Sequence, residues 1–217
     1  MRDQFHDELD LVSATLVQMA GLVKVAMTNA TTALLTADLA LAEKVIQEDA
    51  VIDEIQHDLD ARTINLMARQ QPVASDLRTL VTSLRMSADL ERMGDLAHHI
   101  AKSARMRFPG TAVPPELSLT IEEMGRVCSK IIEKVAVVLE NRDADRALEI
   151  EKDDDEMDTL HRKIISTLLE PNWKHGVETA IDMTLLGRYY ERCADHAVSI
   201  ARRVYFLVKG EFASDAK

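Results

Sequence analysis

The chain has 217 residues and a formal net charge of −11, with 4% aromatic residues, seven glycines and five prolines. This composition, rich in Ala, Leu, Met and Glu, favours long helices over sheets, so we expect an all-α protein. The excess of acids argues against binding to nucleic-acid phosphates or to anionic lipid, and favours cations and basic protein surfaces as partners.

Neither an export signal nor a membrane span is expected. The N-terminal stretch MRDQFHDELD lacks an apolar signal region, and the apolar stretch from residue 11 to 37 is interrupted by Lys24 and several polar side chains. Cys128 and Cys193 have no Cys-x-x-Cys companions and fall on predicted core positions. We therefore expect a reducing cytoplasm and assign neither cysteine a catalytic role.

Three helices are predicted in the first half of the chain. Apolar or small residues recur at alternating steps of four and three from Phe5 to about residue 36, which is typical of a bundle helix. Asp38 is suited to cap a second helix that extends to about Arg69. The breaker at 70–72 contains Pro72, and a third helix is expected from about residue 75 to 107.

The segment RFPGTAVPPE, residues 107–116, contains three of the five prolines and predicts a joint between two units. Beyond it the four-three pattern returns, Asp143 is suited to cap a fifth helix, Pro171 breaks that helix, and a sixth is expected from His175 to Lys209. The prediction is two tandem three-helix bundles, spanning residues 1–109 and 110–217.

The two units match each other in detail. A shift of 105 positions superimposes residues of the second predicted helix on residues of the fifth, and a shift of 100 superimposes ERMGDLAHHIA, 91–101, on ERCADHAVSIA, 191–201. The difference of five residues falls around Pro72 and Pro171, where a loop can absorb it. The chain is therefore an internal duplication of a unit of roughly a hundred residues.

Each unit contains two pairs of acids spaced four residues apart on a helix, which brings both carboxylates of a pair to one face. The pairs are Asp49 with Asp53, Glu91 with Asp95, Asp154 with Asp158, and Glu191 with Asp195. A helical projection places the second pair of each unit opposite the apolar stripe. Adjacent helices can then gather four carboxylates in one groove on the outside of each bundle.

Such spacing is common in an acidic helical chain, and most such pairs lie on solvated faces. An outward pair that recurs in both copies at the same spacing asks for another cause, and metal binding is the best candidate. Oxygen ligands suit magnesium, manganese, calcium or iron, and can also hold zinc. His98, His99 and His196 lie near the pairs without being duplicated, so we expect them to be surface side chains.

The chain resembles the PhoU family of bacterial phosphate-signalling regulators. The resemblance is carried by PVASDLR, 72–78, by LERMGDLAHHIA, 90–101, and by its repeat YERCADHAVSIA, 190–201, and it extends over essentially the whole chain. It implies two tandem three-helix bundles, a dimer, and metal clusters on the bundle surface, with iron, manganese, magnesium or zinc as candidate metals. The matching positions are Asp49, Asp53, Glu91, Asp95, Asp154, Asp158, Glu191 and Asp195.

The resemblance further implies a cytoplasmic adaptor that reaches the membrane only through its partners. It would link the ATPase subunit of a phosphate ABC transporter to a sensor histidine kinase, so that the phosphate-starvation response stays off when phosphate is plentiful. The second unit departs from the first pattern, since WKHGVE stands where QPVASDLR would be. In addition, the run EKDDDEMD leaves the position of its first acid pair open by one residue.

Two alternatives to a non-enzymatic adaptor remain at this point. A di-iron carboxylate oxidase of the ferritin-like class would need two Glu-x-x-His pairs pointing into one core, whereas Gly94 follows Glu91 and Ala194 follows Glu191 at that spacing. The other alternative is a helical scaffold that binds no metal, for which substitution of Glu191 would change no binding.

Overall fold

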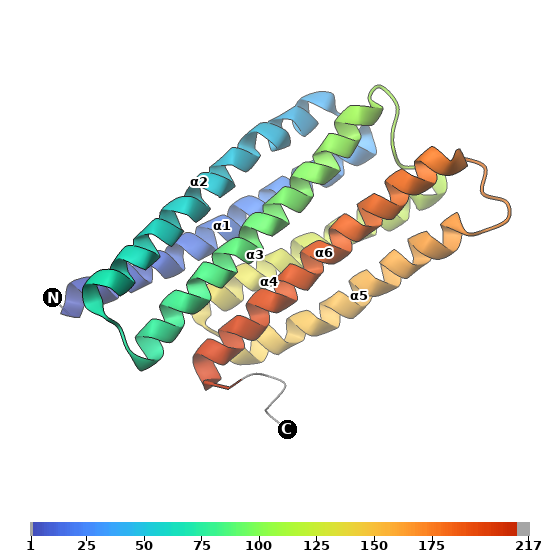
Figure 1. Cartoon of the computed structure of the whole chain (residues 1–217). Helices are drawn as coiled ribbons and strands as arrows, with labels where there is room; N and C mark the ends of the chain where they lie inside the picture. Colours follow the sequence, from blue (N-terminus) through green and yellow to red (C-terminus); the bar gives the residue numbers. More distant parts are fainter. Residues whose placement is uncertain (1, 212–217) are drawn as a thin grey trace.

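The computed structural model describes residues 2–211, with side chains from residue 5 onward, and consists of six helices joined by short connections. Figure 1 shows them in chain order. Their bounds are α1 Arg2–Thr36, α2 Leu39–Gln70, α3 Ala74–Arg107, α4 Pro115–Asn141, α5 Ala144–Leu168 and α6 Gly176–Lys209. The all-α prediction is confirmed, and the described residues contain no strand.

The helix ends follow the local signals in the sequence. The Asp38 carboxylate accepts a hydrogen bond from the amide of Leu41, and the Asp143 carboxylate accepts from the amides of Asp145 and Arg146. Both predicted N-caps are therefore confirmed. Helix α5 ends at Leu168, shortly before Pro171, and α6 begins directly after His175.

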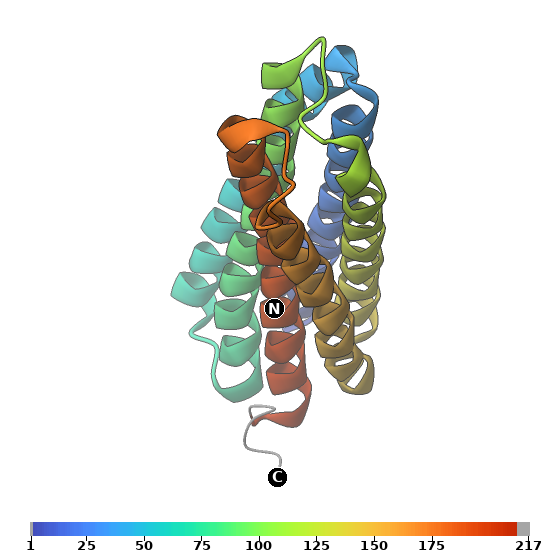
Figure 2. The ribbon, with the colours of Figure 1, turned by 90° about the vertical axis from the view of Figure 1, so that its right-hand side faces the viewer.

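The helices form two layers (Figures 1 and 2). One layer contains α1 and α4, and the other contains α2, α3, α6 and α5 in that order. Contacts run from α1 to α4 and from α3 to α6 as well as within each half of the chain. The two repeats therefore share one continuous hydrophobic core, to which all six helices contribute. The expected boundary at residues 109 and 110 falls in the connection between α3 and α4.

The packing between the repeats is close enough to require a glycine. A Cβ atom on Gly125 of α4 would lie 2.4 Å from the Thr31 side chain of α1, which is shorter than any tolerable contact. The Thr31 hydroxyl is 2.8 Å from the phenolic oxygen of Tyr190, a fully buried residue of α6. Burial raises the pKa of Tyr190, so this hydrogen bond joins two neutral groups inside the shared core.

Helix α1 is the most apolar by composition over a long segment. The segment Phe5–Thr36 of α1 is long and apolar enough to cross a membrane by length and composition alone. In the fold its apolar stripe is buried against α2, α3 and α4. A core helix of a bundle has the same character, so packing accounts for the buried stripe, while Leu11 and Val25 of the same helix are 45% and 53% exposed.

Candidate metal centres

The first carboxylate groove lies between α2 and α3. Asp49 and Asp53 come from α2, and Glu91 and Asp95 come from α3. The pKa of Asp53 is raised by burial and by the charges of Asp49 and Asp95, and the pKa of Glu91 is raised by burial and by the charges of Asp95, Asp53 and Asp49. The structure therefore brings together the four predicted acids of the first repeat at one place.

These side chains are less exposed than the helical projection suggested. The exposed fraction is 11% for Asp49 and 21% for Glu91. The reason is the close approach of the two helices at Gly94, where an added Cβ would lie 3.1 Å from the Ile52 side chain and 3.6 Å from Asp49 Oδ1. Gly94 thus allows α2 and α3 to enclose the groove, at some cost in helix propensity.

Two basic side chains contact the carboxylates of the first groove. His98 Nδ1 is hydrogen-bonded to Asp49 Oδ2, and Arg92 Nη1 donates to Asp95 Oδ2 at 2.6 Å. The prediction that His98 is a surface residue is wrong, because its side chain is only 18% exposed and its Nε2 atom is buried without a hydrogen-bond partner. His98 is an element of the groove, supplied by α3.

The second carboxylate groove lies between α5 and α6 and repeats the first. Burial and the charges of Asp158, Asp195 and Glu191 raise the pKa of Asp154 to about 6. The pKa of Glu191 is also raised, by burial and by the charge of Asp195, while Arg188 and His161 act in the opposite direction. Asp154 Oδ1 is buried and has no hydrogen-bond partner. The four predicted acids of the second repeat therefore also come together.

The structure decides which aspartate of the run EKDDDEMD lies in this groove. Asp153 is nearly buried and forms ion pairs with Lys130 at 2.8 Å and Lys134 at 2.6 Å, both on α4. It therefore belongs to the contact between α4 and α5. Asp154, one residue along, faces α6 and the other carboxylates.

The donor set of each groove suits a metal ion. Four carboxylates supply the oxygen ligands that hard divalent cations prefer, and a cation would offset the burial and the mutual repulsion that raise the pKa values of Asp53, Glu91, Asp154 and Glu191. A buried Asp154 oxygen without a partner is the kind of atom that a metal ion would satisfy. Among the described residues, no three His, Cys, Asp or Glu side chains are already arranged to hold an ion. Binding would therefore require changes of side-chain rotamer.

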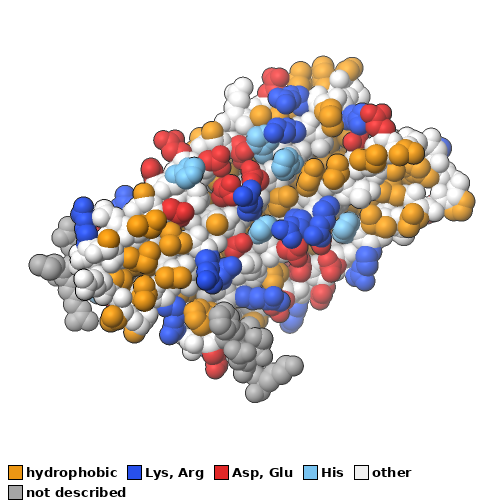
Figure 3. Space-filling model, viewed as in Figure 1, with side chains coloured by type: hydrophobic (Ala, Val, Ile, Leu, Met, Phe, Trp, Pro, Cys, Tyr) orange, Lys and Arg blue, Asp and Glu red, His pale blue; other side chains and the backbone are white. Residues whose placement is uncertain are grey.

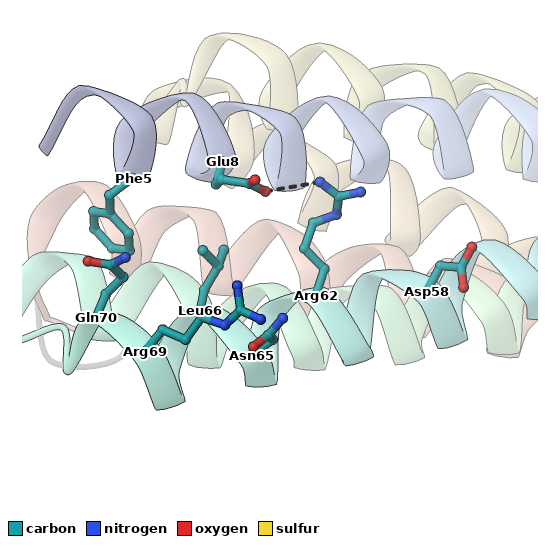
Figure 4. Close-up of a pocket in the computed structure, with 8 residues that line it drawn as sticks. All are labelled: Phe5, Glu8, Asp58, Arg62, Asn65, Leu66, Arg69 and Gln70. Carbon is teal, nitrogen blue, oxygen red and sulfur yellow. Dashed lines mark hydrogen bonds and ion pairs between the residues drawn. The ribbon is translucent and has the colours of Figure 1, made fainter. Parts of the chain in front are cut away.

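Other hollows of the described structure lie away from the carboxylates. One of about 530 Å³ lies between the ends of α1 and α2 and is bridged by the ion pair of Arg62 with Glu8, at 3.0 Å (Figure 4). Another, of about 660 Å³, lies between α1 and α4 and contains Thr28, Thr32 and Thr36. These hydroxyls donate to carbonyls of their own helix, so they offer only acceptors and are poorly suited to binding an anion.

A cluster between α3 and α6 was not predicted. Asp89 accepts hydrogen bonds from His196 at 3.0 Å, Ser199 at 2.9 Å and Arg203 at 3.2 Å, so the prediction of a surface role for His196 is wrong. These hydrogen bonds outweigh the effect of burial and hold the pKa of Asp89 below its ordinary value. The cluster therefore ties one repeat to the other.

At the other end of the contact between α3 and α6, two aromatic rings pack against each other. His99 of α3 stacks on Tyr189 of α6, with ring centroids 5.3 Å apart. Positions 89 and 99 correspond to 189 and 199 after the shift of 100, so the two contacts are related by the duplication. The sequence contains the signal for this arrangement, but only once α3 is known to pack against α6.

Comparison with known proteins identifies the family. A family model described as the PhoU domain matches residues 16–104 and again residues 121–204. The chain is 45% identical, over 212 residues, to the phosphate-specific transport system accessory protein PhoU homolog 2 of Mycobacterium tuberculosis, covering 98% of this chain and 100% of that protein. It is also 45% identical to PhoU homolog 1 of Mycobacterium leprae, covering 99% and 97%.

Solved structures agree with these sequence matches. The crystal structure of PhoU from Pseudomonas aeruginosa superimposes with a TM-score of 0.87 at 30% identity, covering 95% of this chain and 100% of that one. The phosphate transport system regulatory protein PhoU from Streptococcus pneumoniae gives a TM-score of 0.85 at 25% identity, covering 96% and 99%. With the PhoU domain matched twice and both crystal structures superimposing over nearly the whole chain, this chain belongs to the PhoU family.

Proposed function

We propose that this protein regulates phosphate uptake and phosphate-starvation signalling as a non-enzymatic adaptor. Its partners would be the ATPase subunit of a phosphate ABC transporter and a sensor histidine kinase, and it would keep the starvation response off when phosphate is plentiful. The names of its relatives as accessory and regulatory proteins of phosphate transport support the general role. The acidic surface suits basic protein partners.

We further propose that both carboxylate grooves hold metal ions. Asp49, Asp53, Glu91 and Asp95 would hold an ion in the first repeat, and Asp154, Asp158, Glu191 and Asp195 in the second. The observation that carries this proposal is the Asp154 carboxylate, which has one buried oxygen without a partner and whose pKa is raised by burial and by the three other groove carboxylates. A bound divalent or trivalent ion, whether iron, manganese, magnesium or zinc, would supply positive charge that joins two helices of one repeat.

The ferritin-like oxidase is less consistent with the geometry. Such an enzyme places its carboxylates and histidines in the bundle core, whereas the core faces of α3 and α6 carry apolar side chains such as Met93, Ala97 and Cys193. Cys128 and Cys193 are both fully buried, which also argues against a thiol nucleophile. These features support a binding protein over an oxidase.

The cellular setting forms part of the same proposal. A cytoplasmic protein would meet both the transporter ATPase and the kinase, and would reach the membrane only through them. A homodimer is expected from the family resemblance. Chemical cross-linking of the purified protein at several concentrations would test the dimer, and fractionation of cells would test the location.

Binding measurements on purified components test the adaptor role. Immobilised protein would be presented with the transporter ATPase subunit and with the cytoplasmic part of the kinase, each with Mn²⁺ and with a chelator. We expect association that weakens when metal is removed and when Glu91→Gln is combined with Glu191→Gln. The control combines Glu43→Gln with Glu140→Gln, because both are exposed acids outside the grooves. Absence of association with either partner, with and without metal, would refute the adaptor role.

A further inference from the structure

Two groups of exposed apolar side chains occupy corresponding places in the two repeats. In the first repeat Ile64, Leu77 and Val81 are 58%, 40% and 39% exposed. In the second, Leu169, Val177 and Ile181 are 77%, 76% and 54% exposed. We call these groups the first and second apolar triads. Each flanks the connection that leads into the last helix of its repeat.

The triads correspond residue by residue. Ile64 matches Leu169 after the shift of 105, and Leu77 and Val81 match Val177 and Ile181 after the shift of 100. One other exposed pair recurs, Phe108 with Val208, at the far ends of α3 and α6, whereas most exposed apolar residues do not recur. Val51, for example, corresponds to Glu156, and Leu148 corresponds to Glu43. Because an exposed side chain contributes little to folding, its recurrence in both copies points to a contact outside the chain.

Leu77 and Val177 each precede the groove glutamate of their own helix, Glu91 or Glu191, by fourteen residues, which is close to four turns, so they lie near the side of α3 and α6 that carries the carboxylates. Apolar side chains gather over the beginning of α3 and the neighbouring end of α2, and again over the beginning of α6 and the neighbouring end of α5 (Figure 3). Val81 precedes Glu91 by ten residues, as Ile181 precedes Glu191, which is about 15 Å along a helix. The exposed side of α3, and likewise that of α6, therefore changes from apolar near the beginning of the helix to acidic further along.

The arrangement of the whole face is close to two-fold symmetric. Helices α3 and α6 lie side by side and run in opposite directions, so the two triads lie at opposite ends and the acidic groups lie between them (Figures 1 and 3). A partner that engages both triads in the same way must present the same element twice, which a homodimer with a two-fold axis does.

Charge indicates the chemistry of that partner. The eight acids of the two grooves outnumber the three arginines that pair with them, Arg92, Arg188 and Arg192, so the metal-free grooves are net negative and favour basic side chains beside the apolar anchor. A second copy of this chain on the same face would bring two surfaces of like net charge together. An anionic membrane would be repelled by the same charges and by the net charge of −11.

We propose that the two apolar triads are the anchor points of one docking face, and that a homodimeric protein binds it through two copies of an apolar element flanked by basic residues. This inference rests on the proposed adaptor function, because it assigns the docking face of one of the two partners named there. Polar replacement of the triads should therefore weaken binding to that partner without disturbing the fold.

The test compares triad variants in the binding assay with the transporter ATPase subunit and the kinase as probes. Leu77→Ser with Val81→Ser, and Val177→Ser with Ile181→Ser, are each expected to lower the affinity for one probe at least about tenfold, and the four changes together to abolish binding. Leu119→Ser is the matched control, because Leu119 is also 77% exposed but lies on α4 and corresponds to Ala14. Thermal unfolding would verify that all variants fold.

The possible outcomes separate the two proposals. If the wild type binds a probe and the fourfold triad variant binds it equally well, the docking face is refuted and the adaptor function stands. If the wild type binds neither probe, the adaptor function is refuted and the docking face falls with it. Two further outcomes would overturn the protein partner: loss of self-association in sedimentation on triad replacement would assign the face to a second copy, and loss of flotation with anionic phospholipid vesicles would assign it to a membrane.

Discussion

The two carboxylate grooves have the same four acids but differ in the neighbours of those acids. In the first groove Asp49 is hydrogen-bonded to His98. In the second, the equivalent Asp154 has an oxygen without a partner and a pKa raised to about 6. The position that corresponds to His98 is occupied by Val198, whose side chain has no hydrogen-bonding group.

This difference teaches how a duplicated site can diverge. The acids recur in both copies at the same spacing, but one neighbouring position differs. His98 gives Asp49 a hydrogen-bond partner in the first copy, and Val198 gives Asp154 none in the second. Asp154 therefore lacks the compensation that His98 gives to Asp49. We expect the second groove to gain more from a cation for this reason.

The largest effect that tests this comparison is stabilisation by metal. Because a ligand that binds only the folded state stabilises it by mass action, Mn²⁺ at a hundred times its Kd should add about 2.7 kcal/mol per groove to the free energy of unfolding. Asp154→Asn combined with Glu191→Gln should remove the stabilisation that comes from metal in the second groove. Asp49→Asn combined with Glu91→Gln should remove the stabilisation that comes from metal in the first. Urea unfolding with Mn²⁺ and with chelator measures both. Equal stability under the two conditions would contradict metal binding.

The next effect concerns the Asp154 charge in chelator-treated protein. Because folding raises the pKa of Asp154 from 3.8 to about 6, ionisation destabilises the folded state. Stability is lost as the pH rises from about 4 to about 6 and stays lost above that range. Allowing for partial exposure, Asp154→Asn should stabilise the protein by about 1–2 kcal/mol near pH 7.5 and by less near pH 4.5. Urea unfolding at the two pH values measures this change. An equal gain in the free energy of unfolding at both pH values would show that the Asp154 charge is not its cause.

Exchanging the residues at positions 98 and 198 should make each groove resemble the other. His98→Val should leave Asp49 without its partner and cost about 1 kcal/mol of stability near neutral pH. Val198→His should give Asp154 a partner and lower its pKa, which NMR titration of the carboxyl carbon would detect. If Asp154 titrated unchanged in the Val198→His variant, position 198 would not account for the difference between the grooves.

The smallest expected effect concerns the close approach of α2 and α3. Gly94→Ala gains about 1 kcal/mol of helix propensity, but the added methyl group would lie 3.1 Å from the end of the Ile52 side chain. Because that side chain can adjust, we expect the free energy of unfolding to change by less than about 1 kcal/mol. Chemical denaturation measures the change. A loss of several kcal/mol would mean that the first groove tolerates no widening at all.

Much of the fold could be predicted because its signals are local. The four-three apolar pattern and the capping aspartates, Asp38 and Asp143, depend on neighbours within a few residues, and the structure places the helix ends close to the predicted positions. The pairing of the acids could also be predicted, because four-residue spacing and the duplication are visible in the sequence.

What could not be predicted depends on residues far apart in the chain. His98 meets Asp49 across 49 positions, and His196 meets Asp89 across 107. The half-buried state of Glu91 follows from the approach of α2 at Gly94, which a projection of one helix cannot show. The sharing of one core by the two repeats likewise depends on contacts between α1 and α4 and between α3 and α6.

Metal binding by the two repeated grooves is tested most directly by elemental analysis of protein purified without chelator, comparing the wild type with Glu91→Gln, Glu191→Gln and the double variant. We predict that the wild type contains bound metal, that each single variant loses the metal of its own groove, and that the double variant loses the metal of both grooves. The same metal content in the wild type and the double variant, or none in the wild type after incubation with Mn²⁺, Fe²⁺, Mg²⁺ and Zn²⁺, would contradict it.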